Sequence, residues 1–220
     1  MKNIKIFLTV ALTMLAMSSY SQGVIFTVDG KMFWVNEKID NFANLEDVSV
    51  EDGRRIIRIP ISDIVSIEYM EQGLKILQPD KLKKVEPVAF DNNIDAFLAS
   101  GKRVYIPLSS GIIQQRWGAK KLIELVNETD YWKIVGCEDE ADFIMEYVFD
   151  DKGKDHAYLL FSDRLGKKVL SSFSVGATDF VPVHAGEESA EKLFKGYIKK
   201  YIFEGKLSKI VKKDKKASKQ

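Results

Sequence analysis

Cysteine is almost absent from this chain of 220 residues, which contains a single one, Cys137. One cysteine cannot form an internal disulfide, so burial of apolar side chains and strand pairing must stabilise the fold. For Cys137 we expect a small, half-buried residue at a strand end. The alternative is a reactive thiol or an intermolecular bridge.

Histidine is also scarce, with His156 and His184 as the two examples in the sequence. Neither has the spacing of histidine, cysteine and aspartate that is typical of a metal site. A catalytic pair would also need a nucleophile or a metal within reach. We therefore expect both to be solvent-facing loop residues, and the sequence predicts no catalytic residue, no metal ligand and no cofactor.

Long apolar runs are missing except near the N-terminus. Residues 6–17 form an apolar region that follows Lys2 and Lys5 and precedes small residues at Ser19 and Ser21. This pattern predicts a secretory signal peptide over residues 1–21, too short in its apolar part to span a membrane as a mature helix. With no cysteine near the expected cleavage site, no lipoprotein anchor is expected. The mature protein is expected to be soluble and exported, either periplasmic or secreted.

Basic charge is scarce in the body of the chain and concentrated in its tail. Residues 22–205 hold 24 basic and 31 acidic residues, whereas residues 206–220 hold seven lysines and one acid. An acidic body argues against nucleic acid as the main partner, because phosphate binding needs clustered lysine and arginine. The tail is expected to be a solvated, disordered end, or a contact with anionic lipid or an acidic partner. The lysines that would make such a contact are Lys206, Lys209, Lys212, Lys213, Lys215 and Lys216.

Residues 22–79 are predicted to form a small all-β module. Asp29-Gly30 is a strong hairpin signal, and Ile57 and Ile59 belong to a run in which every second residue is apolar. Pro60 lacks an N–H, so its strand is expected at a sheet edge or broken at that point. Five or six short strands with tight turns and no helix predict a small barrel or roll.

Two sequence runs in this module carry a resemblance to a known type of module. They are Val-Asp-Gly-Lys at 28–31 and Ile-Pro-Ile-Ser-Asp-Ile-Val-Ser-Ile-Glu-Tyr at 59–69. This pattern resembles a small β module that recurs in exported proteins of Bacteroidetes-type bacteria. The resemblance implies export and an auxiliary module with no assigned activity.

Residues 93–205 are predicted to form a second, α+β domain after a linker at 80–92, because the stretch 79–92 contains two prolines and a charge run. Apolar side chains at helical spacing predict two amphipathic helices, at 112–128 and 190–203. Between them, residues 141–175 read as an antiparallel meander of three strands separated by Asp/Gly turns. The expected fold is a two-layer α+β sandwich, with a mixed sheet and two main helices on one face.

The first strand of the meander has one strongly apolar face and one mixed face. Phe143, Met145, Tyr147 and Phe149 alternate along the first face, which the two helices can cover. Ile144, Glu146 and Val148 lie on the other, for which no third helix is available. We therefore expect an interface there. The Phe33 and Trp34 pair is a second candidate, as the lining of a ligand groove or as aromatic core.

The second domain resembles envelope-protein domains of the TolB N-terminal and LpoB/CsgG-like type. The residues that carry the resemblance are a helix, a strand ending Trp-Lys-Ile-Val at 132–135, and an Ala-Asp pair at 141–142. It implies a non-catalytic periplasmic interaction domain, and hence another envelope protein as the partner. The sequence thus favours an exported, non-catalytic binding or scaffold protein. The alternatives are a hydrolase-like enzyme with a site between the modules and a membrane-surface protein that uses the lysine tail.

Overall fold

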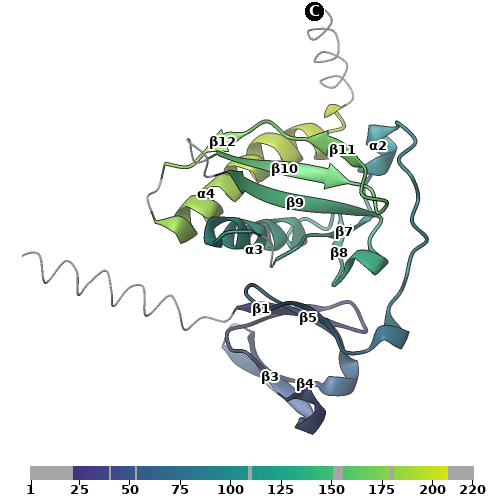
Figure 1. Cartoon of the computed structure of the whole chain (residues 1–220), viewed down its shortest axis with the longest axis vertical. Helices are drawn as coiled ribbons and strands as arrows, with labels where there is room; N and C mark the ends of the chain where they lie inside the picture. The colour runs from purple at the N-terminus through teal and green to yellow at the C-terminus, as the bar shows by residue number, and fades with distance from the viewer. Residues whose placement is uncertain are drawn as a thin grey trace, which may run out of the picture. The chain divides into compact units, whose positions relative to one another are not determined.

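The computed structural model describes residues 22–39, 41–52, 54–108, 111–150, 156–178 and 181–207, and the chain divides into two compact units, Met1–Lys81 and Leu82–Gln220. The predicted signal peptide and the tail beyond Leu207 lie outside the described residues. The fold is α+β, as the sequence predicts: strands build the first unit, and a sheet with helices builds the second (Figure 1).

Two antiparallel sheets make up the first unit. One has the strand order β2-β1-β5-β6, and it consists of β1 (Gly23–Thr27), β2 (Met32–Val35), β5 (Ile64–Tyr69) and β6 (Gly73–Ile76). The other is the hairpin of β3 (Asp47–Asp52) and β4 (Arg55–Pro60), and short 3-10 helices occur at Phe42–Asn44, Ile61–Asp63 and Pro79–Lys81. No ladder joins the two sheets within the described residues, so the unit is not a closed barrel. Pro60 ends β4, an edge strand, as the missing N–H requires.

The turn between β1 and β2 explains why this hairpin forms where the sequence predicts it. Gly30 has φ 80°, a left-handed conformation that glycine adopts without a Cβ clash. The Asp29 carboxylate accepts a 2.5 Å hydrogen bond from the Thr27 hydroxyl and pairs with the Lys31 ammonium at 2.7 Å. These two contacts lower the pKa of Asp29 to about 2.

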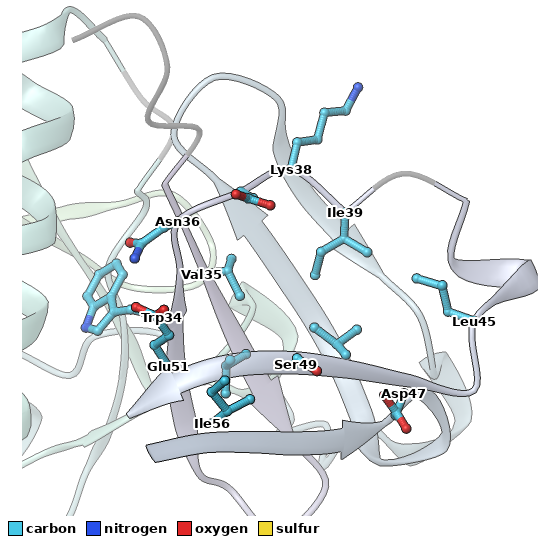
Figure 2. Close-up of a pocket in the computed structure, with 13 residues that line it drawn as sticks. Trp34, Val35, Asn36, Lys38, Ile39, Leu45, Asp47, Ser49, Glu51 and Ile56 are labelled. Carbon is cyan, nitrogen blue, oxygen red and sulfur yellow. The ribbon is translucent and has the colours of Figure 1, made fainter. Parts of the chain in front are cut away.

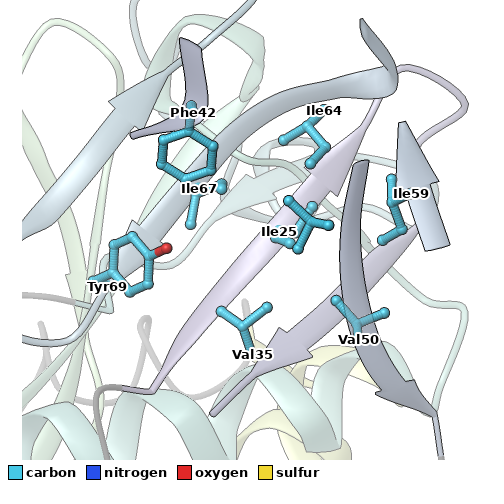
Figure 3. Packing of buried hydrophobic residues seen from close by; sticks show 9 residues of the cluster. Ile25, Val35, Phe42, Val50, Ile59, Ile64, Ile67 and Tyr69 are labelled. Carbon is cyan, nitrogen blue, oxygen red and sulfur yellow. The ribbon is translucent and has the colours of Figure 1, made fainter. Parts of the chain in front are cut away.

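The core of the first unit lies between the four-stranded sheet and the β3–β4 hairpin. Its buried members are Ile25, Val35, Phe42, Val48, Val50, Ile59, Ile64, Ile67 and Tyr69 (Figure 3). Because side chains alternate along a strand, Val48 and Val50 enter this core while Ser49 points away from it. Full burial of each such apolar side chain stabilises the fold by roughly 1.5–3 kcal/mol, which is how the unit holds together without a disulfide.

A mixed sheet forms the centre of the second unit. Its strand order is β11-β10-β9-β7-β8, with β12 paired to β10. The strands are β7 (Arg103–Tyr105), β8 (Lys133–Ile134), β9 (Phe143–Asp150), β10 (His156–Ser162), β11 (Lys168–Ser171) and β12 (Val175–Gly176). β9, β10 and β11 are antiparallel, as the predicted meander requires, whereas β7 is parallel to β8 and to β9.

Helices cover the apolar face of this sheet. α3 (Ile113–Asn127) and α4 (Pro182–Leu193) pack against the face that carries Tyr147, and η5 (Phe194–Phe203) continues α4 as a π-helix. The helix predicted at 190–203 therefore begins at Pro182, eight residues before its predicted start. Proline at the first helical position is favourable, and the predicted helix at 190–203 left this first part out. A short α2 (Ile94–Phe97) is capped by Asn93, whose side chain accepts from the Ala96 N–H.

The segment 82–92, expected to be a linker, is bound to the second unit. The Val85 N–H donates to the Asp139 carbonyl at 2.9 Å, and the Val85 carbonyl accepts from the Arg164 guanidinium. The Phe90 N–H donates to the Asp163 carboxylate at 3.1 Å. The boundary between the units therefore falls between Lys81 and Leu82, and the segment after it is an ordered part of the second unit.

Candidate functional site

A groove of about 570 Å³ opens on the first unit between the end of β2 and β3 (Figure 2). One wall is the continuous stretch 34–39, which is the end of β2 and the loop after it. The other wall is the stretch 47–51 of β3. Because side chains alternate along a strand, five consecutive residues of β3 can line one groove only if the lateral edge of the strand faces it.

Local contacts hold both walls in place. The buried Tyr69 hydroxyl accepts a 3.0 Å hydrogen bond from the Ile39 N–H, which ties the loop after β2 to the core. At the other wall, the side chains of Val48 and Val50 are buried in the core and hold β3 in place. The groove is therefore a feature of the packed unit, with walls attached to buried residues.

The groove combines acidic and apolar groups. Its charged lining residues are the acids Glu37, Asp47 and Glu51 and the base Lys38, so carboxylates exceed ammonium groups by two. Leu45 and Ile56 also line it, with 40% and 73% of their surface exposed to solvent. An exposed isoleucine beside carboxylates offers apolar contact and attraction for cations, which are the properties of a binding surface.

A second groove, of about 440 Å³, lies along the other side of the hairpin and is lined by β4 and the β1–β2 turn. Its carboxylate Asp29 is already bound by Thr27 and Lys31. Its strand edge contains Pro60, which has no N–H to donate. This second groove is therefore less suited to binding a polar main chain.

The predicted aromatic pair is divided between these features. Trp34 lines the first groove and Phe33 lines the second, while Phe33 also packs against the core cluster. They point to opposite faces because they are neighbours on one strand. Groove lining therefore applies to both residues, each at a different groove, and aromatic packing applies to Phe33.

The predicted interface on β9 lies in the second unit. Ile144, Glu146 and Val148 are half-buried on the face of β9 away from the helices. Across the β9–β10 ladder they stand opposite Ser162, Leu160 and Tyr158. The face is thus mixed across two strands, and its apolar members sit beside the carboxylate of Glu146.

The lysines of the predicted tail contact fall mainly outside the described part of the chain. Lys206 is exposed and pairs with Glu204. The others, Lys209, Lys212, Lys213, Lys215 and Lys216, lie outside the described residues.

The two histidines are not the solvent-facing loop residues expected. His184 is exposed but belongs to α4, and His156 is half-buried at the start of β10. The loop expectation was wrong because Pro182 starts a helix and because the strand after the Asp/Gly turn begins at His156 itself. Cys137 is buried, and burial raises the pKa of its thiol.

Neither a metal site nor a membrane span is found among the described residues. Within the ranges that the structure describes, no group of three or more histidine, cysteine, aspartate or glutamate side chains is placed to hold a metal ion. Among the described residues, no helix combines the length and the apolar character needed to cross a membrane.

Comparison with known proteins gives no family, since no family model, curated protein or solved structure matches the chain. The first groove was not predicted as such from the sequence. Its one signal was Trp34 beside Phe33, because alternation on a strand places two adjacent aromatic residues on opposite faces. The other wall comes from residues 47–51, which no local pattern connects to β2.

Proposed function

We propose that this chain is an exported, non-catalytic protein of the cell envelope that binds another envelope protein, with the first groove as the contact site. The observation that carries the proposal is the groove itself, because it places two main-chain walls, exposed apolar side chains and excess carboxylates around one space. Such a combination suits recognition of a polypeptide, which presents main-chain polar groups together with side chains.

Export is the second part of the proposal, and the N-terminal residues support it. Residues 1–21 have the basic start, the apolar run and the small residues before Gln22 that signal peptidases recognise. Fractionation of cells that produce the full chain, with N-terminal sequencing of the mature protein, tests this. Cleavage before Gln22 and recovery with the envelope fraction are expected, and an intact N-terminus in the cytoplasmic fraction would overturn it.

A pair of matched variants tests the groove. Ile56 lines the groove and Val88 lies in the other unit, and each exposes 73% of its surface. Ile56→Asp and Val88→Asp therefore make the same kind of change at equally exposed positions. Tagged mature protein is cross-linked in intact cells, and the cross-linked partners of wild type and both variants are compared. A partner lost in Ile56→Asp and kept in Val88→Asp is expected, whereas equal recovery with both variants would remove the groove from the contact.

A further inference from the structure

The hydrogen-bond pattern of the β3–β4 hairpin determines which backbone groups point into the first groove. The Ile61 N–H donates to the Glu46 carbonyl at 3.0 Å, so this pair is hydrogen-bonded. In an antiparallel ladder, hydrogen-bonded and non-hydrogen-bonded pairs alternate. The register Val48↔Ile59 is then hydrogen-bonded, and Ser49↔Arg58 is not. The N–H and C=O groups of Asp47, Ser49 and Glu51 consequently point away from β4, toward the groove.

Strands at sheet edges contribute to both walls of the groove. Among the described residues, β3 pairs with β4 on one side and has no ladder on its other side. β2 is likewise an edge strand, because it stands at the end of the order β2-β1-β5-β6. No ladder joins β3 to β2 in the described residues, so the edge of β3 that faces the groove has no strand partner there. A strand edge with outward N–H and C=O groups is a template for one more strand.

The charges of the groove specify which strand fits. On β3, Asp47 and Glu51 stand on either side of Ser49 with their side chains on the same face, and Glu37 adds a third carboxylate from the opposite wall. An added strand with basic side chains at alternate positions would meet these carboxylates, and an acidic one would be repelled. The side chains between the basic ones would lie on the opposite face of the added strand, beside Val48 and Val50, which also line the groove, so apolar side chains fit there.

The second groove provides the contrast within the same hairpin. By the same alternation, the groups of β4 that point away from β3 belong to Ile56, Arg58 and Pro60. Pro60 has no N–H to donate, and Arg58 repels a basic strand. Proline and charge at an edge are how sheets prevent unwanted pairing. The hairpin therefore has one edge suited to pairing with a basic strand and one edge protected from it.

We propose that the first groove binds an extended basic segment of a partner protein, which adds to β3 as a further strand. The inference rests on the proposed function in that it takes the partner to be a protein. It adds the conformation of the bound segment, the strand to which it pairs, and the alternation of basic with apolar side chains.

Synthetic peptides test this on the full mature chain. The probe is a peptide of about eight residues in which lysine alternates with valine and threonine, a length within the usual range for one strand. Binding is followed by amide chemical shifts and by titration. We expect the largest shifts at Ser49 and Glu51, and about tenfold weaker binding when glutamate replaces lysine in the peptide, because three carboxylates face the bound strand.

Two further arms separate strand addition from simple charge attraction. Two lysine peptides are N-methylated at alternate positions, one at the odd residues and one at the even residues, and both keep their charge. In one of them the methyl groups replace the N–H groups that would donate to β3, and we expect this peptide alone to lose binding. In the protein, Glu51→Lys is expected to weaken binding of the lysine peptide and to strengthen binding of the glutamate peptide. The proposal would be overturned if both N-methylated peptides bound as tightly as the unmodified peptide. Equal binding of the lysine and glutamate peptides would also overturn it.

The outcome is distinguishable from failure of the proposed function. If no peptide binds while the Ile56→Asp variant still loses its cross-linked partner, the groove binds a folded surface and the strand-addition proposal is wrong. If the lysine peptide binds and shifts Ser49 while cross-linking finds no groove-dependent partner, strand addition stands and the envelope-partner proposal is wrong.

Discussion

Gly118 of α3 lies directly on the ring of Tyr147 in β9: a Cβ at Gly118 would stand 2.1 Å from Cε1 of that ring. Gly186 makes a similar approach from α4, because a Cβ there would stand 2.2 Å from the Gln114 carbonyl oxygen. The Tyr147 hydroxyl donates to the Gly186 carbonyl at 3.1 Å. Two helices and the central strand therefore meet at a point with no room for another carbon.

This close approach predicts a large cost for a small substitution. Gly118→Ala should lower the free energy of unfolding by about 1–3 kcal/mol, because overpacking outweighs the better helix propensity of alanine. Gly196→Ala is the control, since its Cβ would meet the Phe173 ring at an ordinary 3.5 Å. Urea unfolding followed by circular dichroism measures both. Equal midpoints for the two variants would contradict the contact.

A second prediction concerns the buried Asp163, which joins the segment 82–92 to the turn after β10. Its carboxylate accepts from the N–H groups of Phe90, Leu165 and Lys167 at 3.1, 3.1 and 2.8 Å. In Asp163→Asn an amide NH₂ must face at least one of these donors, so we expect a loss of about 2–3 kcal/mol.

Asp91→Asn is the control for Asp163→Asn, because the Asp91 carboxylate accepts from the Asn93 N–H at an exposed position. It should change the free energy of unfolding by less than about 0.5 kcal/mol. Limited proteolysis provides a second measurement, with faster cleavage within 82–92 expected in Asp163→Asn alone. Equal cleavage rates in the two variants would show that Asp163 does not hold the segment.

Cys137 gives a prediction for alkaline pH. Burial raises the pKa of its thiol above the ordinary 9.0, so the folded chain retains the proton where the unfolded chain loses it. Stability from this group is fully present below the unfolded pKa and is lost as the pH rises through the folded value. The wild type should therefore lose stability more steeply than Cys137→Ala above about pH 9.

Thiol labelling checks the same environment independently. With 2% of its surface exposed, Cys137 should react with a disulfide reagent at pH 8 far more slowly in the folded chain than in urea. Labelling at equal rates in both conditions would exclude a buried thiol. Slow labelling would also distinguish the fully buried Cys137 of the structure from the half-buried residue that the sequence predicts.

Glu188 gives a prediction for acidic pH. Its carboxylate accepts from the Thr178 hydroxyl at 2.6 Å and pairs with Lys192 at 2.8 Å, and these partners lower its pKa to about 2. A lowered pKa means stability that is present above the unfolded value near 4.5 and is lost as the pH falls toward 2. Glu188→Gln should therefore be less stable than the wild type at pH 6 and converge with it near pH 2.

The matched control for Glu188 is Glu187→Gln, which removes the same charge from the adjacent position of α4. Thermal unfolding between pH 2 and pH 7 measures all three proteins. A constant difference between Glu188→Gln and the wild type across this range would mean that the carboxylate charge contributes nothing. The contacts are exposed, so added salt should reduce the difference.

Patterns with a strong local cause were predictable from the sequence. The Asp29-Gly30 hairpin, the alternation in the first strand of the meander and the helix at 113–127 all follow from the spacing of apolar residues and from turn chemistry. The start of α4 at Pro182 was missed because its first turn carries no strong apolar period.

The groove was beyond prediction because it depends on contacts between distant parts of the chain. Its walls come from residues 34–39 and 47–51, and the loop of the first wall is held by Tyr69, 30 residues after Ile39. Where a hairpin crosses a sheet is decided by packing of the core, and that packing leaves no periodic signal in the sequence. The sequence could name Trp34 as a candidate but not the strand that faces it.

The attachment of the segment 82–92 has a consequence for the order of folding. Phe90 and Asp163 are separated by 73 residues, and Val85 and Arg164 by 79. Contacts at such distances close late, because the loop entropy must be lost before the contact forms. A chain that is synthesised N-terminus first exposes residues 82–92 before Asp163 and Arg164 are available to bind them. Folding of the second unit must therefore wait until residue 164 has emerged, and until then this stretch is open to proteases and chaperones.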